Sequence, residues 1–485
     1  MGNNGHKLKK RGVKLSFYFL SLLIVAIAAI GGTYAWIGRS VTLPSTVEII
    51  QGTNSSTLDI AASERIGAVY QTLLNNYVEG VDKEALIEGA LSGMVEAVGD
   101  PYSQYLNTEE SENLDESISA SFEGIGAEIM SLNQQIVIVS PIKGSPAEKA
   151  GLLPNDIILS ADGESLQGLT ASEAVALIRG EKGSEVVLEI VRGDQTFKVN
   201  ITRDTIPIET VTFELDEEYP EIGIVHVSSF STPTYDDIVS AVTDLRTQGA
   251  TSFVFDFRQN PGGLLDQALK ISNMFLDDGD VIMQTQEKDA EPNKIVASDS
   301  EFGDFKITEP SVLLVDEGSA SASEIVAGAL QESSEIPLVG TTTFGKGTVQ
   351  TVYPLTESSE LKLTVAKWLT PNGNWIHQKG IAVDYEVALP EYATLTIIDS
   401  TATYEEGTVS EEVKNVEAML NAIGYAVEAD GYYDEATVEQ VASFQAANEL
   451  DATGIVTGDT ALAIVEKLRE VLTENDTQYD KAVEI

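Results

Sequence analysis

The sequence predicts a multidomain protein of the α+β class. Its 485 residues are enough for two to four domains. Between residues 205 and 395, short apolar runs typical of strands alternate with helical patterns, which indicates a layered α/β domain. Apolar stripes with helical spacing before residue 117 and after residue 410 predict separate helical regions. A hydrophobic fraction of 43% and a charged fraction of 22% are ordinary for a globular protein.

Residues 1–38 predict a basic cytoplasmic tail and a transmembrane anchor. Leu15–Ile37 carries no charge and is long enough to cross a bilayer as a helix. The basic residues before it favour a cytoplasmic N-terminus, so we expect a single-pass protein of the cell membrane whose remainder is extracytoplasmic. A cleaved signal peptide is the alternative, because Thr33-Tyr34-Ala35 is a weak cleavage-like site, but the apolar stretch is longer than such a signal needs. Residues 39–60 are polar and predict a tether.

The overall charge and the cysteine count exclude several classes of function. A formal net charge of −48 argues against nucleic-acid binding, since the phosphate backbone is itself negative. We interpret this charge as a solvated acidic surface and not as a calcium array. The chain has no cysteine, which excludes disulfides, thiolate metal sites and a thiol nucleophile, and which suits an exported bacterial protein.

Residues 61–117 predict an N-terminal helical region built around a pair of amphipathic helices. The apolar positions of each helix recur with spacings of three and four residues. The first stripe is Ile66, Val69, Tyr70, Leu73, Leu74 and Tyr77, and the second is Leu86, Ala90, Leu91, Met94 and Val98. Two packing partners stay open for this pair: the rest of the chain, or the same helices of a second subunit.

The chemistry of the chain points to Ser321. Val312–Val315 is an apolar run that predicts a buried strand, and the amphipathic helix that follows begins at Ser321. A serine at such a strand-to-helix turn lies beside backbone N–H groups that have no helical partner, where a nucleophile and an oxyanion hole can be built. The alternative is structural, because Ser321 and Glu324 also fit the capping box that closes a helix N-terminus.

A lysine and a glutamine add to the case for catalysis. Lys346 lies between two glycines, and Gln350 follows in a segment that favours a strand, so positions 346 and 350 share a face. A lysine acts as a general base only when it is neutral, which requires burial to lower its pKa. No histidine favours a Ser–His–Asp triad: His6 is in the basic tail, His226 fits a strand residue and His377 follows a turn.

The two motifs together resemble those of the C-terminal processing peptidases, or tail-specific proteases. The motifs are S-A-S-A-S-E at 319–324 and F-G-K-G-T-V-Q at 344–350. The resemblance implies that Ser321 is the nucleophile, Lys346 the general base and Gln350 the residue that orients it. It also implies that Gly262 or Gly263, in D-F-R-Q-N-P-G-G at 256–263, joins the Ala322 N–H in the oxyanion hole, although this loop could simply be a strand ending in a turn. The implied core, residues 205–395, is an α/β serine protease domain similar to the crotonase fold.

Residues 118–204 resemble a PDZ domain of the bacterial type. Gly124, Ile125 and Gly126 would form the carboxylate-binding loop, whose N–H groups face the C-terminus of a bound peptide. Strand, turn and helix signals follow in the order expected for this domain, from the strand at 136–139 to the helix at 171–178 and the strand at 186–192. The alternative is a small β domain that only packs.

The C-terminal part predicts a linker at 396–409, a three-helix module at 410–470 and a frayed acidic tail at 471–485. The three helical stripes are Val413, Val416, Met419, Leu420 and Ile423, then Val438, Val441 and Phe444, then Leu462, Val465 and Leu468. The module resembles the peptidoglycan-binding domain, but Thr453 stands where aspartate is common and Asp434 where glycine is common.

Taken together, the resemblances imply a membrane-anchored serine endopeptidase that cleaves exported proteins whose C-termini its PDZ domain captures. No metal or organic cofactor is implied. Its partners would be proteins or peptides with exposed C-termini, peptidoglycan, and a second copy through the N-terminal helices. The PDZ domain would also gate the alignment of Lys346. Two alternatives stay open: a cell-wall-associated PDZ scaffold with an inactive core, and a hydrolase directed at peptidoglycan.

Overall fold

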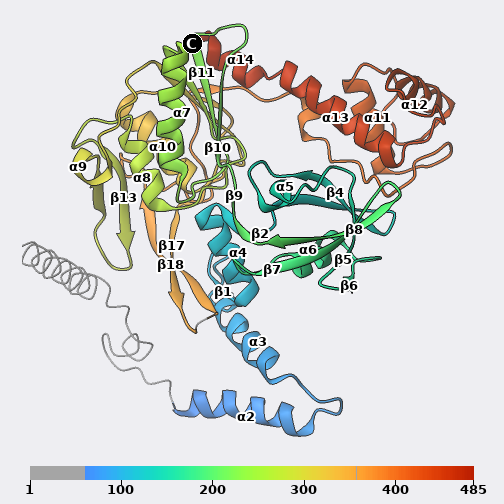
Figure 1. Cartoon of the computed structure of the whole chain (residues 1–485). Helices are drawn as coiled ribbons and strands as arrows, with labels where there is room; N and C mark the ends of the chain where they lie inside the picture. The colour runs from blue at the N-terminus through green and yellow to red at the C-terminus, as the bar shows by residue number, and fades with distance from the viewer. Residues whose placement is uncertain (1–59, 357) are drawn as a thin grey trace, which may run out of the picture. The chain divides into compact units, whose positions relative to one another are not determined.

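The computed structural model describes residues 60–356 and 358–485 (Figure 1). The basic tail, the anchor and nearly all of the tether lie outside these residues. Within the described ranges, no helix combines the length and the apolar character needed to cross a membrane. The chain divides into two compact units, residues 1–99 with 354–359 and residues 100–353 with 360–485.

The described part of the first unit contains the expected helical pair. Its helices are α2 (Ile60–Asn76) and α3 (Lys83–Glu96). The Asp82 carboxylate caps α3 by accepting from the N–H groups of Glu84 and Ala85 at 2.8 and 3.1 Å. The apolar stripes stay open to solvent: Val69 and Val98 are each 63% exposed, and α3 has no buried residue.

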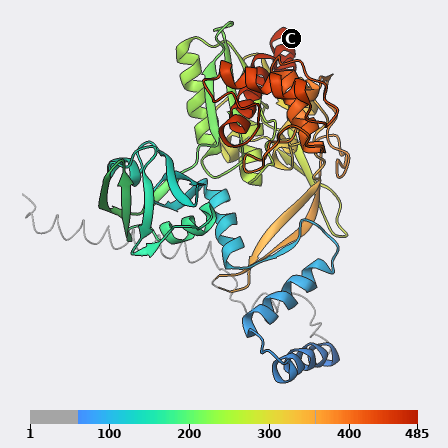
Figure 2. The same ribbon diagram turned by 90° about the vertical axis from the view of Figure 1, so that its right-hand side faces the viewer.

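The second unit begins with β1 (Gln104–Leu106) and α4 (Thr108–Ser119) and continues into a β domain where a PDZ domain was predicted. Its main sheet has the order β3-β4-β5-β7-β8, with β6 on β5, and its teal and green strands form a compact body in Figure 2. The strands are β3 (Ala127–Leu132), β4 (Gln135–Pro141), β5 (Ile157–Ala161), β6 (Glu164–Ser165), β7 (Glu185–Arg192) and β8 (Gln195–Thr202). Helices α5 (Pro146–Lys149) and α6 (Ala171–Ile178) and the pair β2 (Ser121–Gly124) and β9 (Asp204–Pro207) complete it.

The domain that follows is built on a six-stranded sheet of order β10-β11-β12-β15-β16-β19. The first pair is antiparallel and the rest are parallel. The strands are β10 (Val211–Leu215), β11 (Ile222–Val227), β12 (Ser252–Asp256), β15 (Ser311–Val315), β16 (Leu338–Gly340) and β19 (Tyr385–Glu386). Every residue of β15 is buried, as expected for a parallel strand covered on both faces.

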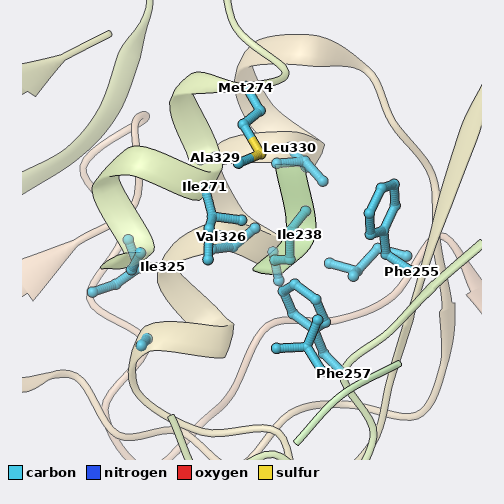
Figure 3. Packing of buried hydrophobic residues seen from close by; sticks show 14 of the residues in the cluster. Ile238, Phe255, Phe257, Ile271, Met274, Ile325, Val326, Ala329 and Leu330 are labelled. Carbon is cyan, nitrogen blue, oxygen red and sulfur yellow. The ribbon is translucent and has the colours of Figure 1, made fainter. Parts of the chain in front are cut away.

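Three helices pack on one face of this sheet: α7 (Thr234–Gln248), α8 (Leu265–Asn273) and α10 (Ala322–Ala329). Phe253, Phe255 and Phe257 alternate along and just after β12 and point to this face, where Figure 3 shows the last two gathered with apolar side chains of the helices. On the other face, Val254, Val312, Leu314 and Val339 pack with Ala482, which lies on the last helix of the chain. The sheet is thus the central layer of the domain.

A second sheet, whose strands come from several parts of the chain, carries part of the candidate site. Its order is β1-β18-β13-β14, with β17 paired to β18. The strands are β13 (Val281–Glu287), β14 (Asn293–Val296), β17 (Thr348–Pro354) and β18 (Glu360–Leu369). Trp368, which is 1% exposed, anchors β18 in the core.

The C-terminal module contains the three expected helices, α11 (Glu411–Ala422), α12 (Glu435–Ala447) and α13 (Gly458–Glu474). Their core includes Val416, Leu420, Val441 and Phe444. The predicted stripe of the third helix was wrong by one position at its start, because Leu462 is 52% exposed while Ala461, Ile464 and Leu468 are buried.

The last residues do not form the frayed tail that the sequence analysis expected. They form α14 (Thr477–Glu484), whose N-terminus is capped by the Asp476 side chain. The composition is polar, but Gln478 and Ala482 are only 1% and 4% exposed because they face the central sheet. Two or three inward residues, which composition alone does not reveal, are enough to fix a helix of two turns.

Candidate active site

Ser321 lies between β15 and α10, on a backbone conformation that is unusual for a residue with a side chain. Its φ and ψ angles are 55° and −109°. Such angles cost energy and persist only where the surrounding structure enforces them. Ala322, the first residue of α10, follows immediately, so Ser321 stands at the helix end whose N–H groups lack helical acceptors.

The Glu324 carboxylate supplies the constraint that holds this turn. Glu324 is fully buried, and its two oxygens accept four hydrogen bonds. Oε2 accepts from the N–H groups of Ser321 and Lys346 at 2.9 and 2.8 Å. Oε1 accepts from the Thr343 hydroxyl and the Gly345 N–H at 2.6 and 2.7 Å. One carboxylate therefore fixes the backbone of the serine turn against the backbone of the lysine segment.

This arrangement bears on both interpretations of the Ser321–Glu324 spacing, the helix cap and the catalytic site. The hydrogen bond from the Ser321 N–H to Glu324 is half of a capping box, so the structural alternative was partly right. The same carboxylate reaches Lys346, which a helix cap does not require. The cap and the assembly of a site are thus one feature.

Lys346 lies in a desolvated environment. Burial lowers the pKa of its ammonium below the ordinary value of 10.5, and the nearby positive charge of Lys362 lowers it further, while Glu324 and Asp100 act in the opposite direction. Its Nζ lies 5.1 Å from the ring centroid of Tyr102, within cation–π range. The indole N–H of Trp368 donates to the Lys346 carbonyl at 2.7 Å and fixes its backbone.

Gln350 lies on β17, on the same face as Thr348. Its Nε2 donates to the hydroxyls of Thr348 and Thr364, each at 3.0 Å. Both amide hydrogens are then used, and the side-chain carbonyl is left to accept from another group. Among the described residues, no hydrogen bond joins Lys346 Nζ to Ser321 Oγ or to Gln350. Glu324 therefore ties the Lys346 backbone to the Ser321 turn, while the Lys346 amine makes no hydrogen bond to Ser321 or Gln350 in the described part of the chain.

The loop after β12 supplies the second wall beside Ser321. A Cβ atom on Gly262 would lie 2.9 Å from both the Ala322 nitrogen and Ser321 Cβ, so only glycine permits this approach. The Gly262 N–H donates to Asn260 Oδ1 at 2.9 Å. The N–H groups of Gly263 and Ala322 have no acceptor within the described part of the chain. Of the two glycines that the sequence analysis left open, Gly263 is therefore the one with a free donor.

Two buried polar residues that sequence reasoning missed hold this loop in place. Asn260 is fully buried, and its side-chain amide donates to the Val227 carbonyl at 2.7 Å. Its backbone carbonyl accepts from the Ala320 N–H at 3.0 Å. Asp316, which precedes the serine turn, accepts from both the N–H and the side-chain amide of Gln259, at 2.8 and 2.7 Å. The sequence signal of such roles is weak: each residue lies two positions before a glycine and shortly after an apolar run.

Neither described histidine contacts Ser321. His226 lies on β11 with its Nδ1 3.5 Å from Asp256 Oδ2, and this interaction raises its pKa even though burial opposes the charge. His377 was expected at the surface, but its ring stacks on Trp375 and meets the edge of Tyr102, with centroid distances of 5.2 and 6.0 Å. The aromatic neighbours near the turn explain this partial burial.

The proposed carboxylate-binding loop of the β domain has the required backbone. Gly126 has a φ of +72°, and a Cβ there would lie 2.5 Å from Ser145 Cβ. The carbonyls of Ile125 and Gly126 accept from Ala147 and Ile142, at 2.8 and 2.9 Å. Their N–H groups have no acceptor among the described residues. Strand β3, which follows this loop, is an edge strand of its sheet, as the addition of a peptide strand requires.

We expect that Glu324→Gln lowers the free energy of unfolding by ~2–4 kcal/mol, because a neutral amide offers one acceptor oxygen to four buried donors. The measurement is thermal and urea unfolding of the purified protein. Glu317→Gln is the matched control: Glu317 is exposed on the same turn, and among the described residues its side chain accepts only from the Thr341 hydroxyl, at 2.9 Å. Equal stabilities of the two variants would contradict the role given to Glu324.

Family models match four segments of the chain. Residues 221–387 match peptidase family S41, and residues 25–110 match the N-terminal domain of the activating protease CtpB. Residues 137–192 match a PDZ domain, and residues 409–464 match a peptidoglycan-binding domain. The PDZ segment spans β4 to β7 of the β domain, and the peptidoglycan-binding segment includes α11 and α12.

Several known proteins resemble the chain over most of its length. The carboxy-terminal processing protease CtpA of Bacillus subtilis (strain 168) is 43% identical over 98% of this chain and 98% of its own. A CtpA-like serine protease of Staphylococcus aureus (strain N315) is 37% identical over 90% of this chain and 87% of its own. Among solved structures, a photosystem II D1 C-terminal processing protease is 29% identical and covers 67% of this chain and 88% of its own, with a TM-score of 0.39.

The strand-to-helix serine, the partly buried lysine and the free N–H groups beside them thus occur in a chain that shares nearly half its residues with a processing protease along almost its whole length. The chain belongs to peptidase family S41, and it is a serine-type C-terminal processing endopeptidase with a PDZ domain and a peptidoglycan-binding domain.

Proposed function

We propose that the chain is a membrane-anchored endopeptidase that uses Ser321, Lys346 and Gln350 to cleave exported proteins whose C-termini its PDZ domain captures. The observation that carries the proposal is the Glu324 carboxylate, which joins the Ser321 turn to the Lys346 segment beside the free N–H groups of Ala322 and Gly263. A nucleophile, a desolvated base and two oxyanion donors are the parts that acyl transfer needs.

In the proposed mechanism, neutral Lys346 accepts the proton of the Ser321 hydroxyl as Oγ attacks the scissile carbonyl. The N–H groups of Ala322 and Gly263 donate to the developing oxyanion. Lys346 then gives the proton to the leaving amine, and the acyl-enzyme forms. Water attacks the ester with Lys346 again as base, which releases the acid product and restores Ser321. The free side-chain carbonyl of Gln350 accepts from the lysine amine and orients it.

The PDZ domain has two roles in this proposal, capture and gating. The free N–H groups of Ile125 and Gly126, with the preceding Gly124, would bind the C-terminal carboxylate, and the peptide would extend along the edge of β3. Because Lys346 is not bonded to Ser321 here, substrate binding would have to align it. A cross-link that fixes the PDZ domain to the core and leaves turnover unchanged would contradict the gating role.

The surroundings of the enzyme form the remaining part of the proposal. The uncharged stretch Leu15–Ile37 supports a membrane anchor, and resistance of the native protein to alkaline carbonate extraction would test it. The exposed apolar stripes of α2 and α3 support pairing with a second copy, which sedimentation analysis of Val69→Lys against the wild type would test. The C-terminal module would retain the enzyme at peptidoglycan, as a pull-down with purified wall fragments would show.

We expect Ser321→Ala and Lys346→Ala each to lower cleavage of an unfolded protein such as casein by ~10³-fold or more, because each removes a group that acts in bond breaking. Gel and mass-spectrometric analysis of the products is the measurement. Ser333→Ala is the control, since within the described ranges that hydroxyl makes one hydrogen bond, to the Val281 carbonyl at 2.7 Å. Cleavage that survives both substitutions would contradict the site. Cleavage of purified stem peptides in preference to casein would favour a wall-directed hydrolase, and no cleavage of either would favour a scaffold.

The pH dependence of kcat/KM should follow the ionisation of Lys346. A base works only when deprotonated, so kcat/KM should rise with pH through the pKa of Lys346, and because burial lowers that pKa the midpoint should lie below 10.5. Lys362→Gln removes a positive charge that lowers this pKa, so the rising limb should move to higher pH.

Lys367→Gln is the matched control for this measurement. Lys367 is exposed on the same strand, with its Nζ 4.1 Å from the Trp375 ring centroid, and it should leave the limb in place. A limb that does not move in Lys362→Gln, or that moves equally in the control, would mean that another group titrates.

A further inference from the structure

We propose that the C-terminal helix α14 is a positioning element of the active site. Asp476 would act by holding Arg258, which lies in the loop at 256–263 that also contains Gly262 and Gly263. The inference rests on the proposed function, because it assigns a role toward the Ser321 site. It concerns the residues that follow the peptidoglycan-binding domain, to which neither the family models nor the sequence motifs give a task.

The chain leaves the protease domain and returns to it at a single place. The Val387 N–H donates to the Gly340 carbonyl at 2.8 Å, at the edge of the central sheet. After the three-helix module, α14 returns to this point: the Thr477 hydroxyl donates to the Ala388 carbonyl at 2.9 Å, and Gln478 Nε2 donates to the Val387 carbonyl at 2.8 Å. The three-helix module is therefore an insertion, and the segments that precede and follow it are hydrogen-bonded to each other on the protease domain.

Helix α14 is built into the protease domain by burial. Ala482 packs with Val254, Val312, Leu314 and Val339, which are the apolar side chains on the face of the sheet opposite α7, α8 and α10. Tyr479 packs at the margin of this cluster, and its hydroxyl donates to the Asp216 carboxylate. Without α14, these strand residues would face water, so the helix completes the layer that the parallel strands require.

Asp476, at the N-terminus of α14, has two roles. Its Oδ1 accepts from the N–H groups of Gln478 and Tyr479 at 3.2 and 3.0 Å, which caps the helix. The same carboxylate binds the Arg258 guanidinium through both oxygens, with Nη1 to Oδ1 at 2.9 Å and Nη2 to Oδ2 at 2.7 Å. A bidentate pair of this kind fixes direction as well as distance.

Arg258 is held from two sides. It donates from Nε and Nη2 to the two oxygens of Asp256, at 2.9 and 2.7 Å, and from Nη1 to Gln478 Oε1 at 3.1 Å. Its side chain is only 15% exposed. The guanidinium thus lies between the carboxylate that begins the loop and the carboxylate that begins α14. Burial opposes the charge of Asp256, but hydrogen bonds from His226 and Arg258 lower its pKa to about 2, so Asp256 is ionised at neutral pH.

The position of Arg258 in the loop connects α14 to the chemistry. The next residue, Gln259, is bonded to Asp316, which precedes the serine turn. The side chain of Asn260 then accepts from the Gly262 N–H. Gly263, with the free donor, follows. Three residues separate Arg258 from Gly262, and the described bonds of this segment lead to the serine turn, to α14, and to β11 with the residues that follow it. Loss of the Asp476 carboxylate removes one of the two carboxylates that hold Arg258 in this loop.

The test compares two variants of the full-length protein in detergent micelles. Asp476→Asn keeps a side chain that can cap α14 but loses the ion pair to Arg258. Asp480→Asn is the matched control, since Asp480 is exposed on the same helix and its side chain makes no hydrogen bond or ion pair within the described residues. The substrate is a fluorogenic peptide with a free C-terminus, and kcat, KM and the unfolding temperature are measured for each.

Because oxyanion donors act on the transition state, we expect Asp476→Asn to lower kcat by ~10-fold with KM changed less than twofold. Asp480→Asn should match the wild type, and Asp476→Glu should recover part of kcat. Hydrogen exchange should also quicken in peptides covering residues 257–263 of Asp476→Asn and stay unchanged in those covering 186–192 of the PDZ domain. Wild-type kcat in Asp476→Asn, or a loss no larger than its unfolded fraction, would overturn the proposal.

Ser321→Ala is measured beside these variants to separate this inference from the proposed function. If Ser321→Ala is inactive while Asp476→Asn keeps the wild-type kcat, the role of α14 is wrong and the catalytic assignment stands. If Ser321→Ala retains activity, the catalytic assignment itself fails, and exchange in residues 257–263 then decides alone whether α14 holds the loop.

Discussion

The candidate site depends on one buried carboxylate. A charged group without solvent is stable only when it is fully hydrogen-bonded, and Glu324 meets this requirement by accepting from four donors on two segments of chain, the serine turn and residues 343–346. Ser321, Thr343 and the Gly345–Lys346 pair must therefore lie where they do as long as the protein is folded. The same hydrogen bonds keep Ser321 in its strained backbone conformation, because releasing it would leave buried donors without an acceptor.

Around this carboxylate, the site is assembled from the ends of parallel strands. The loop 256–263 follows β12, and the serine turn follows β15. Because the two strands are parallel, hydrogen-bonded neighbours, the loops that follow them meet. Asn260 and Asp316 bond the two loops to each other, and the N–H groups of Gly263 and Ala322 have no acceptor among the described residues. The lysine arrives from a different sheet, at the start of β17, and only its backbone is fixed in the structure described here. In the proposed mechanism, substrate binding moves this side chain toward Ser321.

The sequence was sufficient for features that depend on local pattern. The strand at 312–315, the helix at 171–178 and the helical pair near the N-terminus follow from apolar spacing and caps, and the structure contains them. The contacts that span long stretches of chain could not be read in this way. Arg258 and Asp476 are 218 positions apart, and nothing in either neighbourhood predicts the pair. The same holds for Gly262 and Gly263, where the choice turned on Asn260 Oδ1 accepting one N–H and leaving the other. The acidic tail was misjudged because two buried positions outweighed its polar composition.

The most direct test of the central claim is to trap the acyl-enzyme. The protein is mixed with a slowly hydrolysed p-nitrophenyl ester, quenched in acid and digested, and the modified peptide is located by mass spectrometry. A single acyl group on Ser321 of the wild type, absent from Lys346→Ala, is the result that the account predicts. Acylation of a different residue, or equal labelling of Ser321 when Lys346 is missing, would contradict it.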